Sequence, residues 1–108
     1  PELKGLTPIN PACLKNAGLD VAICTDHPVI PIQYLSLSAA VSSKSGLPYE
    51  DALKSITINA ARITGIEQTV GSIKVGKDAD IILFNGNPLD VMVEPYMVIV
   101  NGNIVKSV

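Results

Sequence analysis

The feature that most constrains the fold is a short apolar run at residues 20–25 (DVAICT), which ends directly in Asp26. The run is too short for a helix, and its apolar residues fall on both alternating faces of an extended chain. A strand covered on both sides is typical of parallel sheets, which carry helices on their faces. We therefore predict a buried strand. One face would carry Val21, Ile23 and Thr25, and the other Ala22, Cys24 and Asp26.

Helix signals surround this run. Asn10 followed by Pro11 predicts an N-cap and a first helical position, and Gly18 suits the left-handed end of that helix. Further helices are predicted over residues 32–45, from residue 48, and over residues 58–64. Their expected buried side chains are apolar and helically spaced: Tyr34, Leu37, Ala40, Val41, Ala52, Leu53 and Ile56. This order of elements predicts an α/β layer.

The composition changes at about Gln68, where glycines begin to punctuate short β-branched runs. Strands are predicted over residues 79–84, 97–100 and 104–106. Asn101-Gly102 is a strong signal for a hairpin between the last two. We therefore divide the chain into an α/β segment, residues 1–67, and a β module, residues 68–108.

Charge and composition exclude several classes of partner. The net charge is −2 and the eight basic residues do not cluster, so we expect neither nucleic acid nor a membrane surface as partner. Hydrophobic residues make up 47% of the chain and charged residues 17%, against about a quarter charged in ordinary soluble domains. We interpret the excess as an interface, and expect a homo-oligomer or association through exposed apolar helices. Because the first residue is Pro1, we also expect a fragment of a longer protein.

The two cysteines, Cys13 and Cys24, lack C-x-x-C spacing. We expect reduced, buried thiols and a cytoplasmic location, with a disulfide between the two as the alternative. A buried thiol lacks the electropositive exposure that activates a nucleophile, so Cys24 is not a candidate catalytic residue.

Asp26 is the candidate catalytic residue. It follows a predicted parallel strand, and α/β folds build active sites at the carboxyl ends of such strands. Its carboxylate could bind a divalent metal or accept a proton from water, or it could merely cap a helix or accept loop N–H groups. His27, the one histidine, could contact a substrate or a metal, or bond only to main chain or water. These two residues cannot complete a zinc site, which needs about three protein ligands.

Several motifs carry a resemblance to a known family. Residues 57–65 (TINAARITG), 71–80 (GSIKVGKDAD) and 87–88 (NP) resemble the C-terminal signature of the amidohydrolase superfamily. Residues 25–31 (TDHPVIP) resemble the last barrel strand of its imidazolonepropionase-like branch. The resemblance covers essentially the whole chain.

The resemblance implies a fold. Residues 1–67 would be the last strand and helices of a (β/α)8 TIM barrel, and residues 68–108 the C-terminal strands of a small composite β-sandwich. The family's H-x-H pair and its later histidine ligands are absent from this chain, as are barrel strands one to seven. We therefore expect an incomplete fragment that is inactive by itself.

The resemblance also implies an activity. The parent would be a metal-dependent hydrolase of non-peptide C–N bonds, with a small cyclic amide or amidine as substrate. Asp26 would be metal ligand and general base, whereas the resemblance gives His27 no general role, and we expect of it no more than a substrate contact. The metal would be divalent: zinc, iron or manganese. The alternatives are a deacetylase-like or dihydroorotase-like branch of the superfamily, or a non-catalytic module for folding or self-association.

Overall fold

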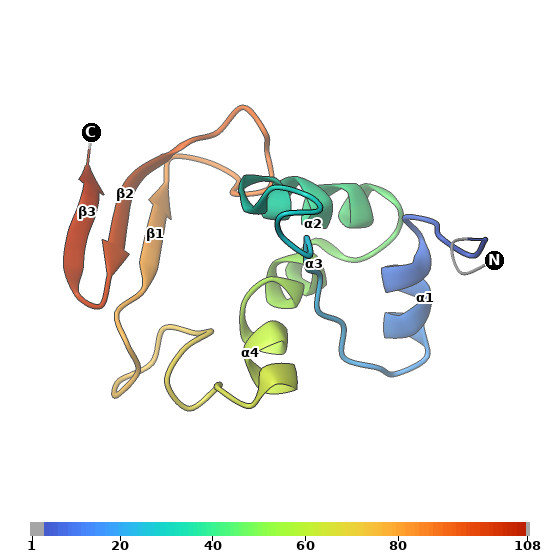
Figure 1. The fold of residues 1–108 in the computed structure, drawn as a ribbon, viewed down its shortest axis with the longest axis horizontal. Coiled ribbons are helices and arrows are strands. Elements are labelled where there is room, and N and C mark those ends of the chain that lie inside the picture. Colours follow the sequence, from blue (N-terminus) through green and yellow to red (C-terminus); the bar gives the residue numbers. More distant parts are fainter. Residues whose placement is uncertain (1–3, 108) are drawn as a thin grey trace.

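Helices and strands occupy separate parts of the molecule in the computed structural model, which describes residues 4–107 (Figure 1). The helical part contains α1 (Asn10–Asn16), the 3-10 turn η1 (Ile32–Tyr34), α2 (Leu35–Lys44), α3 (Tyr49–Ser55) and α4 (Ile58–Thr64). The other part is an antiparallel sheet of β1 (Ile81–Phe84), β2 (Pro95–Val100) and β3 (Asn103–Ser107), in that order. The described residues therefore form an α/β structure, as predicted.

Glycine and proline set the helix ends as predicted. Gly65 ends α4 with φ of 78°, Gly18 follows α1 with φ of 83°, and Pro48 precedes α3. These positive φ values lie in the left-handed region that glycine adopts without steric cost. The predicted Asn10 cap is wrong, because the helix begins one residue earlier. Ile9 is the N-cap, and the Asn10 side-chain amide instead donates a hydrogen bond to the Gly5 carbonyl oxygen, 3.0 Å away.

The core is small and is built mostly from alanines. Its cluster of buried residues consists of Ala12, Ala39, Leu47, Ala52 and Leu89, with Ile23, Ala40, Leu53 and Ile56 packed against it. The predicted apolar face of α3 is therefore confirmed.

The predicted stripe of α2 is wrong for its large residues. Tyr34, Leu37 and Val41 are 47%, 40% and 43% exposed. The helix instead buries the small residues Ala39 and Ser42, which allow it to lie close to its neighbouring helices. Residues 4–107 leave two-fifths or more of each of these three large side chains uncovered.

The β2–β3 hairpin is confirmed. Its turn residues Asn101 and Gly102 have φ of 48° and 79°, and a type I′ turn requires positive φ at both central positions.

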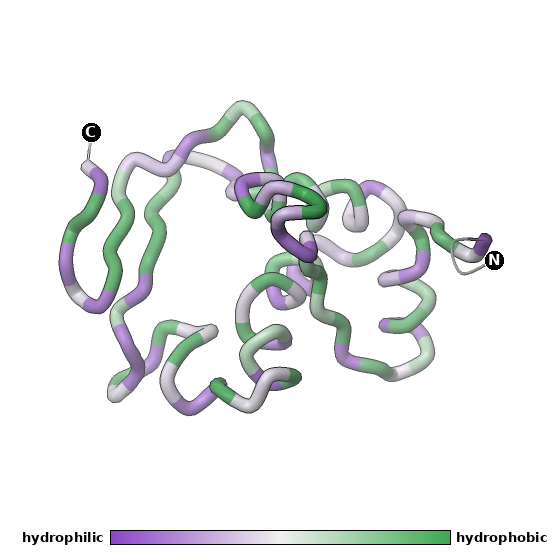
Figure 2. Tube along the Cα trace, viewed as in Figure 1, coloured by the Kyte–Doolittle hydropathy of each residue, from purple (hydrophilic) through white to green (hydrophobic). Residues whose placement is uncertain are grey.

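Hydrophobic residues follow one another along β1 and β2 (Figure 2). Because β1 is at one edge of the sheet and β3 at the other, both strands keep an edge that pairs with no strand among the described residues.

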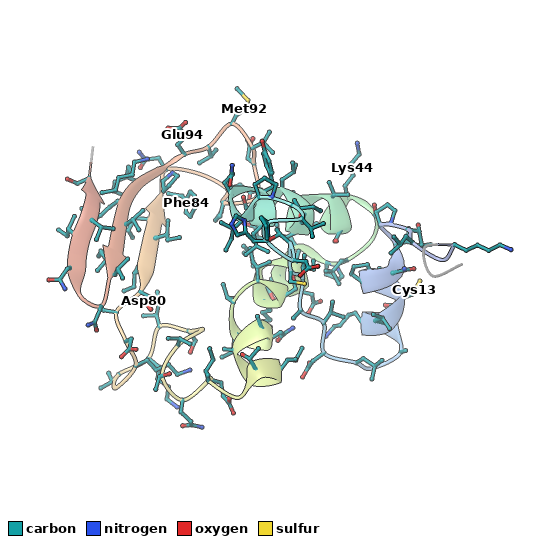
Figure 3. All side chains as sticks on the ribbon, in the orientation of Figure 1. Cys13, Lys44, Asp80, Phe84, Met92 and Glu94 are labelled. Atoms are coloured by element: carbon teal, nitrogen blue, oxygen red, sulfur yellow. The ribbon has the colours of Figure 1, made fainter. Side chains whose placement is uncertain are left out.

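A large apolar cleft separates the helices from the sheet. Its volume is about 1020 Å³. Phe84 projects from β1 towards it (Figure 3), and Ile56 and Ala60 line the helical side. None of the helices in residues 4–107 combines the length and the hydrophobicity that a membrane-spanning helix needs.

Candidate active site at Asp26 and His27

The segment before Asp26 is held by α3 and α4 from one side. The Ile23 N–H donates a hydrogen bond to the Ser55 carbonyl oxygen at 3.0 Å, and the Asn59 side-chain amide donates to the Val21 carbonyl oxygen at 3.2 Å. Ser55 and Asn59 are themselves buried. The helices therefore set the path of the main chain that leads to Asp26.

The predicted two-face pattern of this segment is confirmed. Val21 and Thr25 are buried and Ile23 is half-buried, whereas Ala22, Cys24 and Asp26 are exposed. No described segment pairs with residues 20–25, so they form no sheet strand in this structure, and their place as a barrel strand stays a prediction. A parallel ladder needs a neighbouring strand, so a segment of this kind forms no ladder alone.

Asp26 lies in a tight turn. Its φ is 51°, in the left-handed region that asparagine and aspartate enter more readily than other non-glycine residues. The turn is closed by main-chain hydrogen bonds from Val29 N–H to the Asp26 carbonyl oxygen (2.8 Å) and from Ile30 N–H to the Thr25 carbonyl oxygen (3.2 Å). Unusual backbone conformations of this kind cluster at functional sites.

The Asp26 carboxylate accepts no hydrogen bond and forms no ion pair within the described part of the chain. Neither of the two alternatives for this residue, a helix cap or an acceptor of loop N–H groups, is therefore realised by residues 4–107. An exposed carboxylate without such partners can take a cation or a proton.

His27 is exposed beside Asp26. Its Nδ1 accepts a hydrogen bond from the Ile32 main-chain N–H, 3.2 Å away, so the ring contacts the main chain at the start of η1. No described residue contacts Nε2 by a hydrogen bond.

Residues 4–107 contain no cluster of three or more His, Cys, Asp or Glu side chains that could hold a metal ion. Asp26 suits the role of one ligand, because its carboxylate is accessible and is not used elsewhere in this structure. The remaining ligands of a metal centre would have to come from other residues.

Both cysteines are free, as predicted, but both are exposed, which contradicts the prediction of buried thiols. For Cys24 the reason is its place on the same uncovered face as Asp26.

The structure explains why two of the sequence motifs occur together. Asn59 lies in the TINAARITG motif and anchors residues 20–25 through its bond to the Val21 carbonyl oxygen. The sequence alone did not reveal this role. Gly71, the first residue of the GSIKVGKDAD motif, packs against the same helix. A Cβ at Gly71 would lie 2.6 Å from the Ala61 Cβ and 3.2 Å from the Ile58 Cα. The two motifs therefore contact each other, and one of them supports the segment that presents Asp26.

Comparison with known families gives a match over most of the chain. Residues 4–105 match the model described as "Amidohydrolase family". Among curated proteins, the chain is 38% identical over 96 residues to "Amidohydrolase tasK" of Hapsidospora irregularis, covering 89% of this chain and 10% of that protein. It is 34% identical over 83 residues to an imidazolonepropionase of Shouchella clausii, covering 72% of this chain and 18% of that protein.

Solved structures give the same result. An amidohydrolase from Thermotoga maritima superposes with a TM-score of 0.93 and 39% identity, over 99% of this chain and 28% of that one. A Xaa-Pro dipeptidase with bound methionine in its active site superposes with a TM-score of 0.75 and 28% identity, over 86% of this chain and 24% of that one. The chain therefore spans between about a tenth and about a quarter of the length of these proteins.

Proposed function

Because the chain belongs to the amidohydrolase family, we propose that it is the C-terminal part of a metal-dependent hydrolase of C–N bonds, in which Asp26 is metal ligand and general base. The observation that carries this proposal is the Asp26 carboxylate, exposed at the end of a segment that helices cover on its other face. The imidazolonepropionase resemblance of residues 25–31 supports the same role.

In this proposal residues 20–25 are the last strand of a (β/α)8 barrel, and the sheet β1–β3 belongs to a small β-sandwich. The alternation of buried and exposed residues supports the barrel strand, because one face of such a strand meets the outer helices and the other faces the barrel interior. The uncovered Ala22, Cys24 and Asp26 would then face that interior.

The chemistry assigned to this chain is proton transfer at Asp26. A divalent ion, proposed to be zinc, iron or manganese, would polarise the substrate carbonyl and acidify water. Asp26 would be one of the groups that hold the ion. It would accept the proton of the attacking water as the C–O bond forms, and return it to the leaving nitrogen as the C–N bond breaks. His27 would contact the substrate.

The test is a chimera in which this chain replaces the segment that it matches in the Thermotoga maritima amidohydrolase. Asp26→Asn should lower kcat/KM by about 10³-fold, the middle of the range for loss of a general acid–base residue. Asp20→Asn is the matched control, because Asp20 is exposed on the same segment but up to about 20 Å away. Full turnover in the Asp26→Asn chimera would refute the proposed catalytic role of Asp26.

For the substrate we propose a cyclic amide or amidine, which the likeness to imidazolonepropionases favours. The likeness to a Xaa-Pro dipeptidase supports a second candidate, a dipeptide. A panel that contains imidazolonepropionate, other cyclic amides and Xaa-Pro dipeptides separates the two, since kcat/KM should be highest for the correct class.

We further propose that the chain associates through its apolar surface, and that in isolation it is catalytically inactive. It exposes 7674 Å², whereas a compact 11.3 kDa protein exposes about 5,700 Å². The excess is more than the roughly 800 Å² that each partner buries in a standard interface. Glu67 Oε2 is also buried with no hydrogen-bond partner among residues 4–107, as is expected of a group that meets a donor on another segment.

The two free thiols support a cytoplasmic location.

A further inference from the structure

The hydrogen bond between His27 and Ile32 determines which ring nitrogen carries the proton. A neutral imidazole has one N–H and one nitrogen with a free lone pair. In the neutral ring, the bond from the Ile32 N–H to Nδ1 at 3.2 Å assigns the lone pair to Nδ1 and the proton to Nε2. The same bond gives the Ile32 N–H an acceptor. Ile32 is the first residue of η1, and the first N–H groups of a helical turn have no acceptor within that turn.

This tautomer leaves His27 without a nitrogen for a metal. The Nδ1 lone pair is occupied by Ile32, and Nε2 carries the proton. If the proton moved to Nδ1, two N–H groups would face each other and Ile32 would lose its acceptor. The ring can, however, donate from Nε2, which no described residue contacts by a hydrogen bond.

We propose that His27 binds substrate by donating its Nε2–H to a carbonyl or carboxylate oxygen close to the scissile C–N bond, and that it is not a metal ligand. This inference rests on the proposed function, because it needs a substrate at Asp26. The Cα atoms of neighbouring residues are about 3.8 Å apart, and both side chains are exposed, so one bound molecule can meet both. The substrate would therefore carry a carbonyl or carboxylate oxygen close to the bond that is cleaved.

Two substitutions separate the donor role from the structural role. Asparagine places its amide oxygen near the position of Nδ1, so His27→Asn keeps an acceptor for Ile32 and loses the outer donor. Glutamine places its amide nitrogen near the position of Nε2, so His27→Gln keeps the donor. In the chimera, His27→Asn should raise KM about tenfold, and His27→Gln should leave KM within about threefold. The metal content should stay unchanged in both variants.

The opposite pattern overturns the proposal. An unchanged KM in His27→Asn would show that the ring only supports the loop. Loss of metal in both variants would show that His27 is a ligand.

The tautomer can be measured without any substrate. His27 is the one histidine of the chain, so a long-range ¹H–¹⁵N spectrum of the labelled 108-residue protein contains a single imidazole. At alkaline pH we expect Nδ1 to show the ¹⁵N chemical shift of an unprotonated ring nitrogen, and Nε2 to show that of a protonated one. The reverse assignment, or equal averaging of the two, would refute the inference. If the isolated chain gives a poorly dispersed spectrum, the chimera is used, with His27→Asn identifying the signals by their loss.

The two proposals fail in different ways. If the unmodified chimera needs no metal, or if Asp26→Asn retains turnover, the proposed function is wrong. If the chimera is active and depends on Asp26 while His27→Asn binds substrate normally, the proposed function stands and the donor role of His27 is wrong.

Discussion

Replacing Gly71 by alanine should destabilise the chain by about 3 kcal/mol. The first contribution comes from the main chain: Gly71 has φ of +94°, a conformation that costs an L-residue roughly 1–2 kcal/mol. The second comes from packing, because the new Cβ would lie 2.6 Å from the Ala61 Cβ and 3.2 Å from the Ile58 Cα. Overfilling a packed site of this kind costs about 1–3 kcal/mol.

Gly76→Ala isolates the first contribution. Gly76 has nearly the same φ, +93°, but no atom lies within 4 Å of the position its Cβ would take. This variant should therefore lose only about 1–2 kcal/mol. The measurement is urea denaturation followed by circular dichroism, with the free energy of unfolding taken from the midpoint and slope.

A double substitution tests the contact itself. Ala61→Gly removes the atom that a Cβ at residue 71 would meet at 2.6 Å, at the cost of about 1 kcal/mol for a glycine inside α4. The combined Gly71→Ala and Ala61→Gly chain should lose clearly less stability than the sum of the two single losses. Equal losses in Gly71→Ala and Gly76→Ala, together with simple additivity in the double variant, would refute the close approach of the two motifs.

The remaining predictions concern the support of the site and the apolar surface. Asn59→Ala should cost about 1–3 kcal/mol of unfolding free energy, because it leaves the Val21 carbonyl oxygen buried without its donor. Asn103→Ala, which removes an exposed amide bond to the Asn101 carbonyl oxygen, should cost less than about 0.5 kcal/mol; equal losses would refute the anchoring role of Asn59. Static light scattering of the isolated chain should show a mass that rises with concentration, and a constant monomer mass would contradict the proposed association.

The secondary structure could be predicted well where a single residue type decides the backbone. Gly65, Pro48 and the Asn101-Gly102 pair act through their own φ preferences, so the ends of α4, the start of α3 and the β2–β3 turn follow from local chemistry. The Asn10 cap was wrong because a cap depends on where the chain enters the helix, and here the side-chain amide finds the Gly5 carbonyl oxygen instead.

The candidate site could be predicted only in part. The alternation in residues 21–25 placed Ala22 and Cys24 on the face opposite Val21 and Thr25, because side chains of an extended segment alternate, whereas Asp26 lies in the turn that follows. Two hydrogen bonds could not be predicted. The bond from the Ile32 N–H to His27 depends on the conformation of the loop between them, and the bond from Asn59 to Val21 joins residues that are 38 positions apart.

By itself, the sequence determined the ends of the helices, the hairpin turn and the two faces of residues 21–25. These properties depend on the φ preferences of single residues and on the two-residue period of an extended chain. Only the tertiary structure decided which side chains are covered. It left Tyr34, Leu37, Val41 and Cys24 exposed and brought Gly71 against Ala61. The physical reason is that burial requires a second surface, and the position of that surface depends on how distant segments pack.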